Sequence, residues 1–259
     1  MSIDGVVHYL LDRARVDVAL VKITEPTKDS YVIAIETDVT GTGPIGTRVS
    51  PMELDLTYEG KCFAKLRTPE LQTHWWGGAK VKVEEQKVQI LDMATYRDYV
   101  QSVLVSKETG FHLENGVCTI RALGIGIPCT YRLRVPIRGM MGLAGTVTKV
   151  ERSRLDQEHI AVTARLQNPS PVEMDHGMSS FEFRNTTGEL ISLLKGDVKI
   201  VRGDFEVKLE GKLERSFTPT PKGKLVGVGV DGDSWCKETI KYISLDVNIP
   251  TECAAALSA

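Results

Sequence analysis

The chain has 259 residues, of which 42% are hydrophobic and 25% are charged, and its formal net charge is −2. This is the composition of an ordinary soluble globular protein, long enough to form two hydrophobic cores. The near-neutral charge excludes the strongly basic surface typical of nucleic-acid-binding proteins, so we expect no nucleic-acid partner.

The cysteines and the N-terminal sequence indicate a cytoplasmic protein. The five cysteines are odd in number, widely spaced and in no CxxC motif, which argues against both a disulfide framework and a zinc site. Asp4 stands where a secretory signal carries positive charge, and no apolar run approaches the roughly 20 residues that span a bilayer. We therefore expect reduced thiols, no metal and no membrane span.

The first half of the chain predicts mostly strands with two helices. Apolar residues recur at three- and four-residue spacing from Ile3 to Ala14, which predicts a short amphipathic helix. From Val16 to Ile90 the apolar residues alternate with polar ones, the pattern of strands. Asp92 is placed to cap a helix that follows it, and more strands lead to residue 137.

The strand from Ile33 and the segment after it occur twice. Ile33 to Leu56 repeats as Ile160 to Phe183 at a constant offset of 127 residues. An offset of this length suits a small domain and is too long for a solenoid repeat. We therefore predict a mainly β chain of two tandem antiparallel β-sandwich domains with one or two short helices. The domains are residues 1–138, with an N-terminal and an internal helix, and residues 139–259.

Several short motifs have ordinary structural explanations. The segment from Gly41 to Gly46 matches the dinucleotide fingerprint GxGxxG, but a strand is expected after it where the fingerprint needs a helix. Asp231-Gly-Asp233 is more often an exposed turn than a calcium site, and Asn185-Thr-Thr187 is expected to be a turn. The five histidines are scattered and form no catalytic motif. We expect neither a cofactor nor a metal.

The strongest candidate for a binding site is the segment His74-Trp75-Trp76-Gly77-Gly78, which holds two of the three tryptophans between two strands. One interpretation is that both rings cap the end of the first sandwich. The other is that they form an aromatic wall over an apolar small-molecule site, with His74 as a polar group and the glycines as hinges. Trp235 in the second half either faces the same cavity or packs in the core.

Four sequence features suggest a resemblance to a known family. They are the turn Asn168-Pro-Ser-Pro171, the alternating run from Leu54 to Gly60, Pro69, and the run from Gln86 to Asp92 before a helix. In these features the chain resembles a family of uncharacterised fungal proteins built on the late-embryogenesis-abundant, water-stress type of β-sandwich. In size and layout it is also similar to a soluble branch, the fungal hetero-Diels-Alderases of tropolonic sesquiterpene biosynthesis.

This resemblance implies a cofactor-free pericyclase that joins a sesquiterpene polyene to a tropolone quinone methide in one apolar pocket. Such a reaction requires mainly that two reactants be held in a productive pose. The catalytic residues are unknown, and the substrate-binding candidates are His74, Trp75, Trp76 and Trp235. The alternative is a non-catalytic lipid- or terpenoid-binding protein, or a stress-protective module, and the oligomeric state stays open, a homodimer included.

Overall fold

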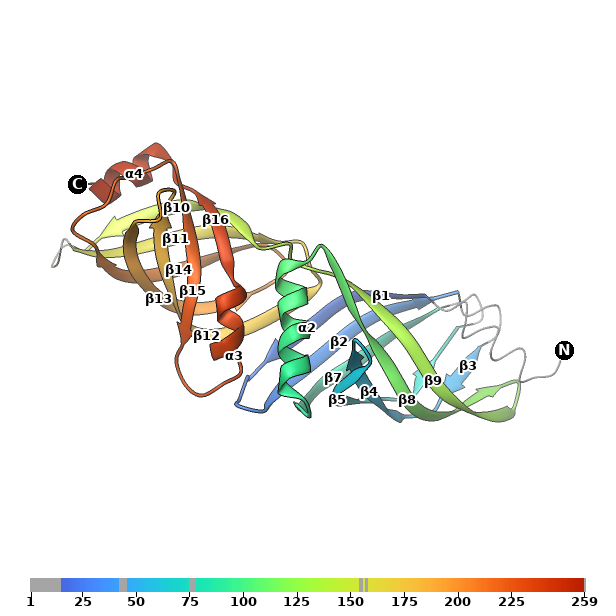
Figure 1. The fold of residues 1–259 in the computed structure, drawn as a ribbon. Coiled ribbons are helices and arrows are strands. Elements are labelled where there is room, and N and C mark those ends of the chain that lie inside the picture. Colours follow the sequence, from blue (N-terminus) through green and yellow to red (C-terminus); the bar gives the residue numbers. More distant parts are fainter. Residues whose placement is uncertain (1–14, 42–45, 75–77, 154–155, 157, 259) are drawn as a thin grey trace. The chain divides into compact units, whose positions relative to one another are not determined.

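The computed structural model describes residues 15–41, 46–74, 78–153, 156 and 158–258. The chain is mainly β, as predicted, with short helices between and after the strands. Contacts divide it into two compact units (Figure 1). The first unit holds the described residues up to Ile23 with Asp29–Tyr99 and Glu108–Arg138, and the second holds Thr24–Lys28, Val100–Lys107 and Gly139 onward. The predicted helix between Ile3 and Ala14 lies outside the described residues.

The first unit contains two sheets. In one sheet the strands follow the order β1-β2-β7, and in the other the order is β5-β4-β8-β3-β6, with β9 paired to β8. The strands are β1 (Arg15–Thr24), β2 (Ser30–Thr40), β3 (Thr47–Val49), β4 (Met52–Tyr58), β5 (Lys61–Thr68), β6 (Leu71–Gln72), β7 (Ala79–Gln89), β8 (Glu108–Ala122) and β9 (Ile125–Arg138). Strand β3 follows the glycine-rich segment directly, so no helix opens where the dinucleotide fingerprint needs one.

The predicted internal helix is α2 (Met93–Val105), and Asp92 caps it as expected. Both carboxylate oxygens of Asp92 accept hydrogen bonds from Thr95, one from its backbone N–H and one from its hydroxyl. These bonds favour the charged carboxylate, so the pKa of Asp92 lies below its usual value. The first turns of the helix bury Tyr96 against Tyr31 and Tyr99 against Phe63, with ring centroids 5.1 and 5.3 Å apart. Stacked aromatic pairs therefore fix this end of the helix on the first unit.

The second unit closes on itself. Its strands follow the order β13-β14-β11-β10-β16-β15-β12, and β12 also pairs with β13, so the sheet forms a ring. The elements are β10 (Ala144–Arg152), β11 (His159–Asn168), β12 (Val172–Asn185), β13 (Leu190–Ile200), β14 (Gly203–Leu213), β15 (Lys222–Val230), α3 (Cys236–Thr239), η1 (Ile240–Tyr242), β16 (Ser244–Asn248) and α4 (Thr251–Ser258). The pairings among these strands are antiparallel, except that of β10 with β16, which is parallel. A closed sheet has no free edge, which protects it from pairing with other chains.

The strands that carry the sequence repeat have the same neighbours in both units. Ile33 lies on β2, between β1 and β7, and Ile160 lies on β11, between β10 and β14. Leu54 lies on β4, between β5 and β8, and Phe181 lies on β12, between β13 and β15. All four side chains are buried. The constant offset in the sequence therefore matches a shared pattern of strand pairing.

The turns after the repeated segment differ in length, because two residues separate β4 from β5 and four separate β12 from β13. In the first unit Glu59 and Gly60 both have positive φ and connect β4 to β5. In the second unit the buried Asn185 organises the turn: its side-chain oxygen accepts hydrogen bonds from Thr187 and Glu189, and its amide donates to the carbonyl of Thr218. Asn185 is thus a turn residue, as expected, and its amide is occupied inside the protein.

Candidate apolar ligand site in the first unit

The two sheets of the first unit enclose a cavity of about 70 Å³. Aliphatic and aromatic side chains form nearly all of its wall, and the polar side chains in it are two threonines and one tyrosine. The lining residues are Val16, Val18, Val21, Ile35, Thr37, Val39, Met52, Leu54, Leu66, Thr68, Leu71, Val81, Val83, Phe111, Leu113, Tyr131, Leu133 and Val135.

Strand periodicity places these side chains on the inner faces. Successive residues of a strand point to opposite faces, so residues two apart share one face. Val81 and Val83 on β7 line the cavity, and Lys80 and Lys82 beside them are exposed. Leu133 and Val135 on β9 also line the cavity, and Arg132 and Arg134 beside them are exposed. Both sheets therefore contribute an apolar inner face and a charged outer face.

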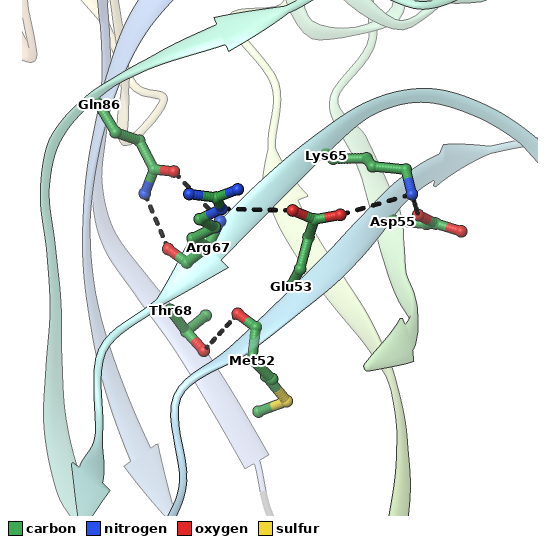
Figure 2. Close-up of polar contacts among 7 residues, drawn as sticks. All are labelled: Met52, Glu53, Asp55, Lys65, Arg67, Thr68 and Gln86. Atoms are coloured by element: carbon green, nitrogen blue, oxygen red, sulfur yellow. Dashed lines mark hydrogen bonds and ion pairs between the residues drawn. The ribbon is translucent and has the colours of Figure 1, made fainter. Parts of the chain in front are cut away.

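Three hydroxyl groups belong to the wall, and they differ in availability. The Thr68 hydroxyl donates a hydrogen bond of 3.4 Å to the backbone carbonyl of Met52 (Figure 2). Burial raises the pKa of Tyr131 to about 12, with the nearby thiols of Cys118 and Cys129 adding to the shift. Tyr131 is therefore a neutral phenol at physiological pH, able to donate a hydrogen bond. Thr37 adds a hydroxyl from the opposite sheet.

Strands β5 and β7 border the cavity on the side where the two sheets meet, and we call the gap between them the seam. Within the described residues, the backbone pairing across the seam is a single bridge between Ala64 and Ile90. Further along, the side-chain amide of Gln86 donates to the carbonyl of Arg67 at 2.8 Å and accepts from its N–H at 3.1 Å (Figure 2). One side chain therefore substitutes for a backbone ladder.

Charged residues cover the outer face of β4 and β5 beside the seam. Glu53 pairs with Arg67 at 3.3 Å and with Lys65 at 3.5 Å, and Lys65 also pairs with Asp55 (Figure 2). These side chains are mostly exposed, so each pair adds little stability. They fix Arg67 and Lys65 on the outside and leave the inner face apolar.

The second unit shows why the seam has no ladder. In the first unit Ile33 on β2 pairs with Gln86 on β7. In the second unit the equivalent residue, Ile160 on β11, pairs with Gly211 on β14. A Cβ atom at Gly211 would collide with the backbone carbonyl oxygen of Leu193 on β13. Glycine therefore lets β13 and β14 approach closely enough to form a ladder, whereas the side chain of Gln86 occupies that space in the first unit.

The structure places the predicted site residues as follows. Trp75 and Trp76 lie outside the described residues. His74 is exposed, and its backbone N–H donates to the carbonyl of Gly78 at 3.0 Å. Trp235 is buried in the second unit, where its ring lies 6.4 Å from the ring of His176. Neither His74 nor Trp235 lines the described cavity, and their role in binding stays a prediction.

The lining residues were not singled out from the sequence as a site. The signal for them is the alternation in β1, β2, β7 and β9, which also describes any sandwich core. Within the described residues no group of three or more His, Cys, Asp or Glu side chains is arranged to hold a metal ion. In the described part of the chain, no helix is both long and apolar enough to cross a bilayer.

The fold and the cavity define a mainly β protein with an apolar internal space in its first unit. A family described as "Protein of unknown function (DUF3712)" matches residues 61–183, from β5 in the first unit to β12 in the second. A comparison with curated proteins gives no match.

Solved structures give distant likenesses. Red sea bream transglutaminase is 17% identical over 92% of this chain and 31% of its own, with a TM-score of 0.26. The chaperone–tip adhesion subunit complex CsuC–CsuE of Acinetobacter baumannii is 11% identical over 92% and 99%, with a TM-score of 0.20. CBD12 from CALX1.2 is 10% identical over 83% and 89%, with a TM-score of 0.23. The chain thus spans about a third of the transglutaminase, and scores this low carry no functional argument.

Proposed function

We propose that the first unit binds an apolar small molecule of the terpenoid or polyene class between its two sheets. The single observation that carries this proposal is the cavity wall, in which apolar side chains surround the hydroxyls of Tyr131 and Thr37. Ligand sites in proteins have this composition: mostly hydrophobic, with a few polar groups that fix orientation. Tyr131, as a neutral phenol, would donate a hydrogen bond to a ligand oxygen.

Ligand entry requires the cavity to widen. Its volume of about 70 Å³ is well below the roughly 300–1,000 Å³ typical of small-molecule sites. The seam is a place where widening costs little, because the Gln86 side chain and one backbone bridge hold β5 to β7 there. We propose that the sheets separate at the seam when the ligand enters.

The catalytic form of the proposal is a cofactor-free hetero-Diels-Alder cycloaddition between a sesquiterpene polyene and a tropolone quinone methide. The heterodiene and the alkene give up three π bonds and form two new σ bonds and one new π bond in one step, with no redox partner and no proton transfer. Holding both in a reactive pose contributes up to about 7–11 kcal/mol, and a hydrogen bond from Tyr131 to the quinone-methide oxygen would polarise it further. His74, Trp75, Trp76 and Trp235 stay the substrate-binding residues predicted from the sequence.

A second candidate function is binding without turnover, by a lipid- or terpenoid-binding or stress-protective protein of the late-embryogenesis-abundant type. The small size of the cavity favours it, because one narrow apolar ligand needs less widening than two reactants. Both candidates rest on a proposed architecture of two tandem β-sandwich domains divided near Gly139. The equal strand neighbours of Ile33 and Ile160 support the tandem part of that architecture.

A binding experiment with matched variants tests the proposal. The full chain is titrated with a fluorescent polyene and with a sesquiterpene polyene as competitor. Val83→Phe fills the cavity and should weaken binding at least tenfold, and Leu209→Phe, at the equivalent strand position of the second unit, is the control that should leave binding unchanged. Thermal melts select variants that stay folded. Absence of binding by the wild type, or equal binding by folded Val83→Phe, would refute the proposed site.

A turnover assay separates the two candidate functions. The protein is incubated with the polyene and a quinone-methide precursor, and the adducts are resolved by chiral chromatography. Rate acceleration and one dominant stereoisomer support the pericyclase, and Tyr131→Phe should lower that rate with little change in the melting temperature. A racemic adduct at the uncatalysed rate, with intact binding, supports the non-catalytic function.

A further inference from the structure

Two of the cysteines face each other across the hairpin formed by β8 and β9. Leu123 and Gly124, both with positive φ, form its two-residue turn, and Ala122 pairs with Ile125 on either side of it. Counting back from the turn, Cys118 pairs directly with Cys129, and their Sγ atoms lie 3.2 Å apart. The thiols are therefore close enough for one to donate a hydrogen bond to the other in the reduced protein.

The backbone geometry at this pair suits a disulfide. Pairs in an antiparallel ladder alternate between hydrogen-bonded and non-hydrogen-bonded, and a two-residue turn is flanked by a hydrogen-bonded pair. Cys118 and Cys129 fall four residues from that pair and so are hydrogen-bonded too, and Pro128, which has no N–H, falls on a non-hydrogen-bonded position. Hydrogen-bonded pairs have a Cα separation of about 5.5 Å, within the range that disulfides require.

The environment of the pair makes one thiol accessible and shields the other. Cys118 is 3% exposed and packs with Met52, Leu54 and Ile120. Cys129 is only partly buried at the edge of the same cluster. The other cysteines have backbone partners or lie elsewhere: Cys62 bonds to the carbonyl of Ala64 and Cys253 to that of Val147.

We propose that Cys118 and Cys129 form a reversible cross-strand disulfide when the protein meets a low-molecular-weight disulfide such as oxidised glutathione. The Cys129 thiolate attacks the oxidant, forms a mixed disulfide and releases one glutathione thiolate. The Cys118 thiolate then attacks Cys129 Sγ and releases the second glutathione. Two protein thiols are oxidised, one glutathione disulfide is reduced to two glutathione molecules, and the two thiol protons pass to the glutathione thiolates or to buffer.

The second step is expected to limit the rate. Burial and the contact with Cys129 raise the pKa of the Cys118 thiol, so little of it is thiolate at neutral pH. Closure of the bond should therefore accelerate about tenfold for each pH unit between 7 and 9, because the thiolate fraction rises by that factor below the pKa. Bond formation also shortens the sulfur separation to about 2.05 Å, a change that side-chain rotation can supply, and it fixes β8 to β9 beside Leu113 and Tyr131 in the cavity wall.

Peptide mapping tests the proposal directly, because trypsin cuts between the two cysteines after Arg121. The folded full chain is incubated with oxidised glutathione at pH 8, unfolded, alkylated and digested without reductant. We expect residues 108–121 to appear joined to residues 122–132, to separate on reduction, and the other three cysteines to be alkylated. Cys62→Ser should leave this link intact, and Cys118→Ser should leave Cys129 as the glutathione mixed disulfide.

Five alkylated cysteines after exposure of the wild type would overturn the proposal, and so would a link through Cys62 or between chains. A rate that does not increase with pH would overturn the assignment of Cys118 as the resolving thiol. None of these outcomes depends on ligand binding. The experiment therefore tests the disulfide independently of the proposed function.

Discussion

The two units share the pairings of the strands that carry the repeat, and they differ where their strands close the sheet. In the second unit β10 pairs with β16 and β13 pairs with β14, whereas among the described residues of the first unit β9 pairs with β8 and not with β1, and β5 meets β7 in one bridge. In the second unit Ser192 to Lys195 pair with Leu213 to Glu210 in a backbone ladder, and a cavity among the core side chains measures about 10 Å³. In the first unit the Gln86 side chain bridges the seam, and a cavity of about 70 Å³ remains. At the equivalent strand positions, the closed contact carries Gly211 and the open one carries Gln86.

The largest effect is expected from adding a side chain at the closed contact. Gly211→Ala would push a Cβ into the carbonyl oxygen of Leu193, and backbone atoms cannot move aside cheaply. We expect a loss of about 3 kcal/mol in the free energy of unfolding, the upper end for overpacked sites, measured by urea denaturation. Gly229→Ala is the control, because a Cβ there meets no atom within 4 Å. Equal stability of the two variants would show that the glycine does not determine closure.

The next effect concerns acid stability of the second unit. His176 is buried beside Trp235, and neither ring nitrogen has a hydrogen-bond partner among the described residues. Burial lowers the pKa of His176 to about 4, with Asp175 acting in the opposite direction. Between pH 6.5 and 4 the unfolded chain therefore binds a proton that the folded chain does not, so stability falls as the pH falls through this window.

The loss should reach about 2 kcal/mol at pH 5 relative to pH 7, since one pKa unit corresponds to about 1.4 kcal/mol. Urea unfolding at the two pH values, followed by circular dichroism, measures it. His176→Leu removes the titrating group and should abolish most of the difference. A wild-type protein equally stable at both pH values would show that His176 is not kept neutral by burial.

The smallest effect is expected at the seam itself. Gln86→Ala removes two hydrogen bonds to the backbone of Arg67, which are partly open to solvent. We expect a loss of about 1 kcal/mol together with faster uptake of an apolar ligand in a stopped-flow experiment. Lys65→Ala on the outer face is the matched control, because its exposed ion pairs do not cross the seam. Identical uptake rates for both variants would mean that the ligand enters elsewhere.

The strands and the internal helix follow from local patterns in the sequence. Alternation in β1, β2 and β7, the Asp92 cap and the repeated Ile33 segment all involve neighbours within one element, which is where periodicity is informative. The mainly β class was therefore predictable. The side-chain amide bonds of Gln86 were not, because they join residues 19 positions apart and depend on a strand pairing that periodicity does not specify.

The candidate site was less predictable than the fold. The tryptophans Trp75 and Trp76 attract attention by composition, whereas the cavity is lined by ordinary valines and leucines that any strand core contains. Gly211 and Gln86 are also not aligned by the constant offset of 127, because the offset between them is 125, and a bulge in β7 near Glu84 and Glu85 accounts for one residue of the difference. Their equivalence becomes visible only when each is found opposite its isoleucine in the sheet.

Amide hydrogen exchange of the reduced, ligand-free protein tests the central claim most directly. Residues 64–67 of β5 and residues 192–195 of β13 occupy equivalent positions, each paired on one side with β4 or β12. Only the β13 residues have a backbone ladder on the other side as well. We predict that amides in residues 64–67 that point to the seam exchange at least tenfold faster than their counterparts in residues 192–195. Equal protection of the two segments would contradict the open seam and, with it, the proposed route into the cavity.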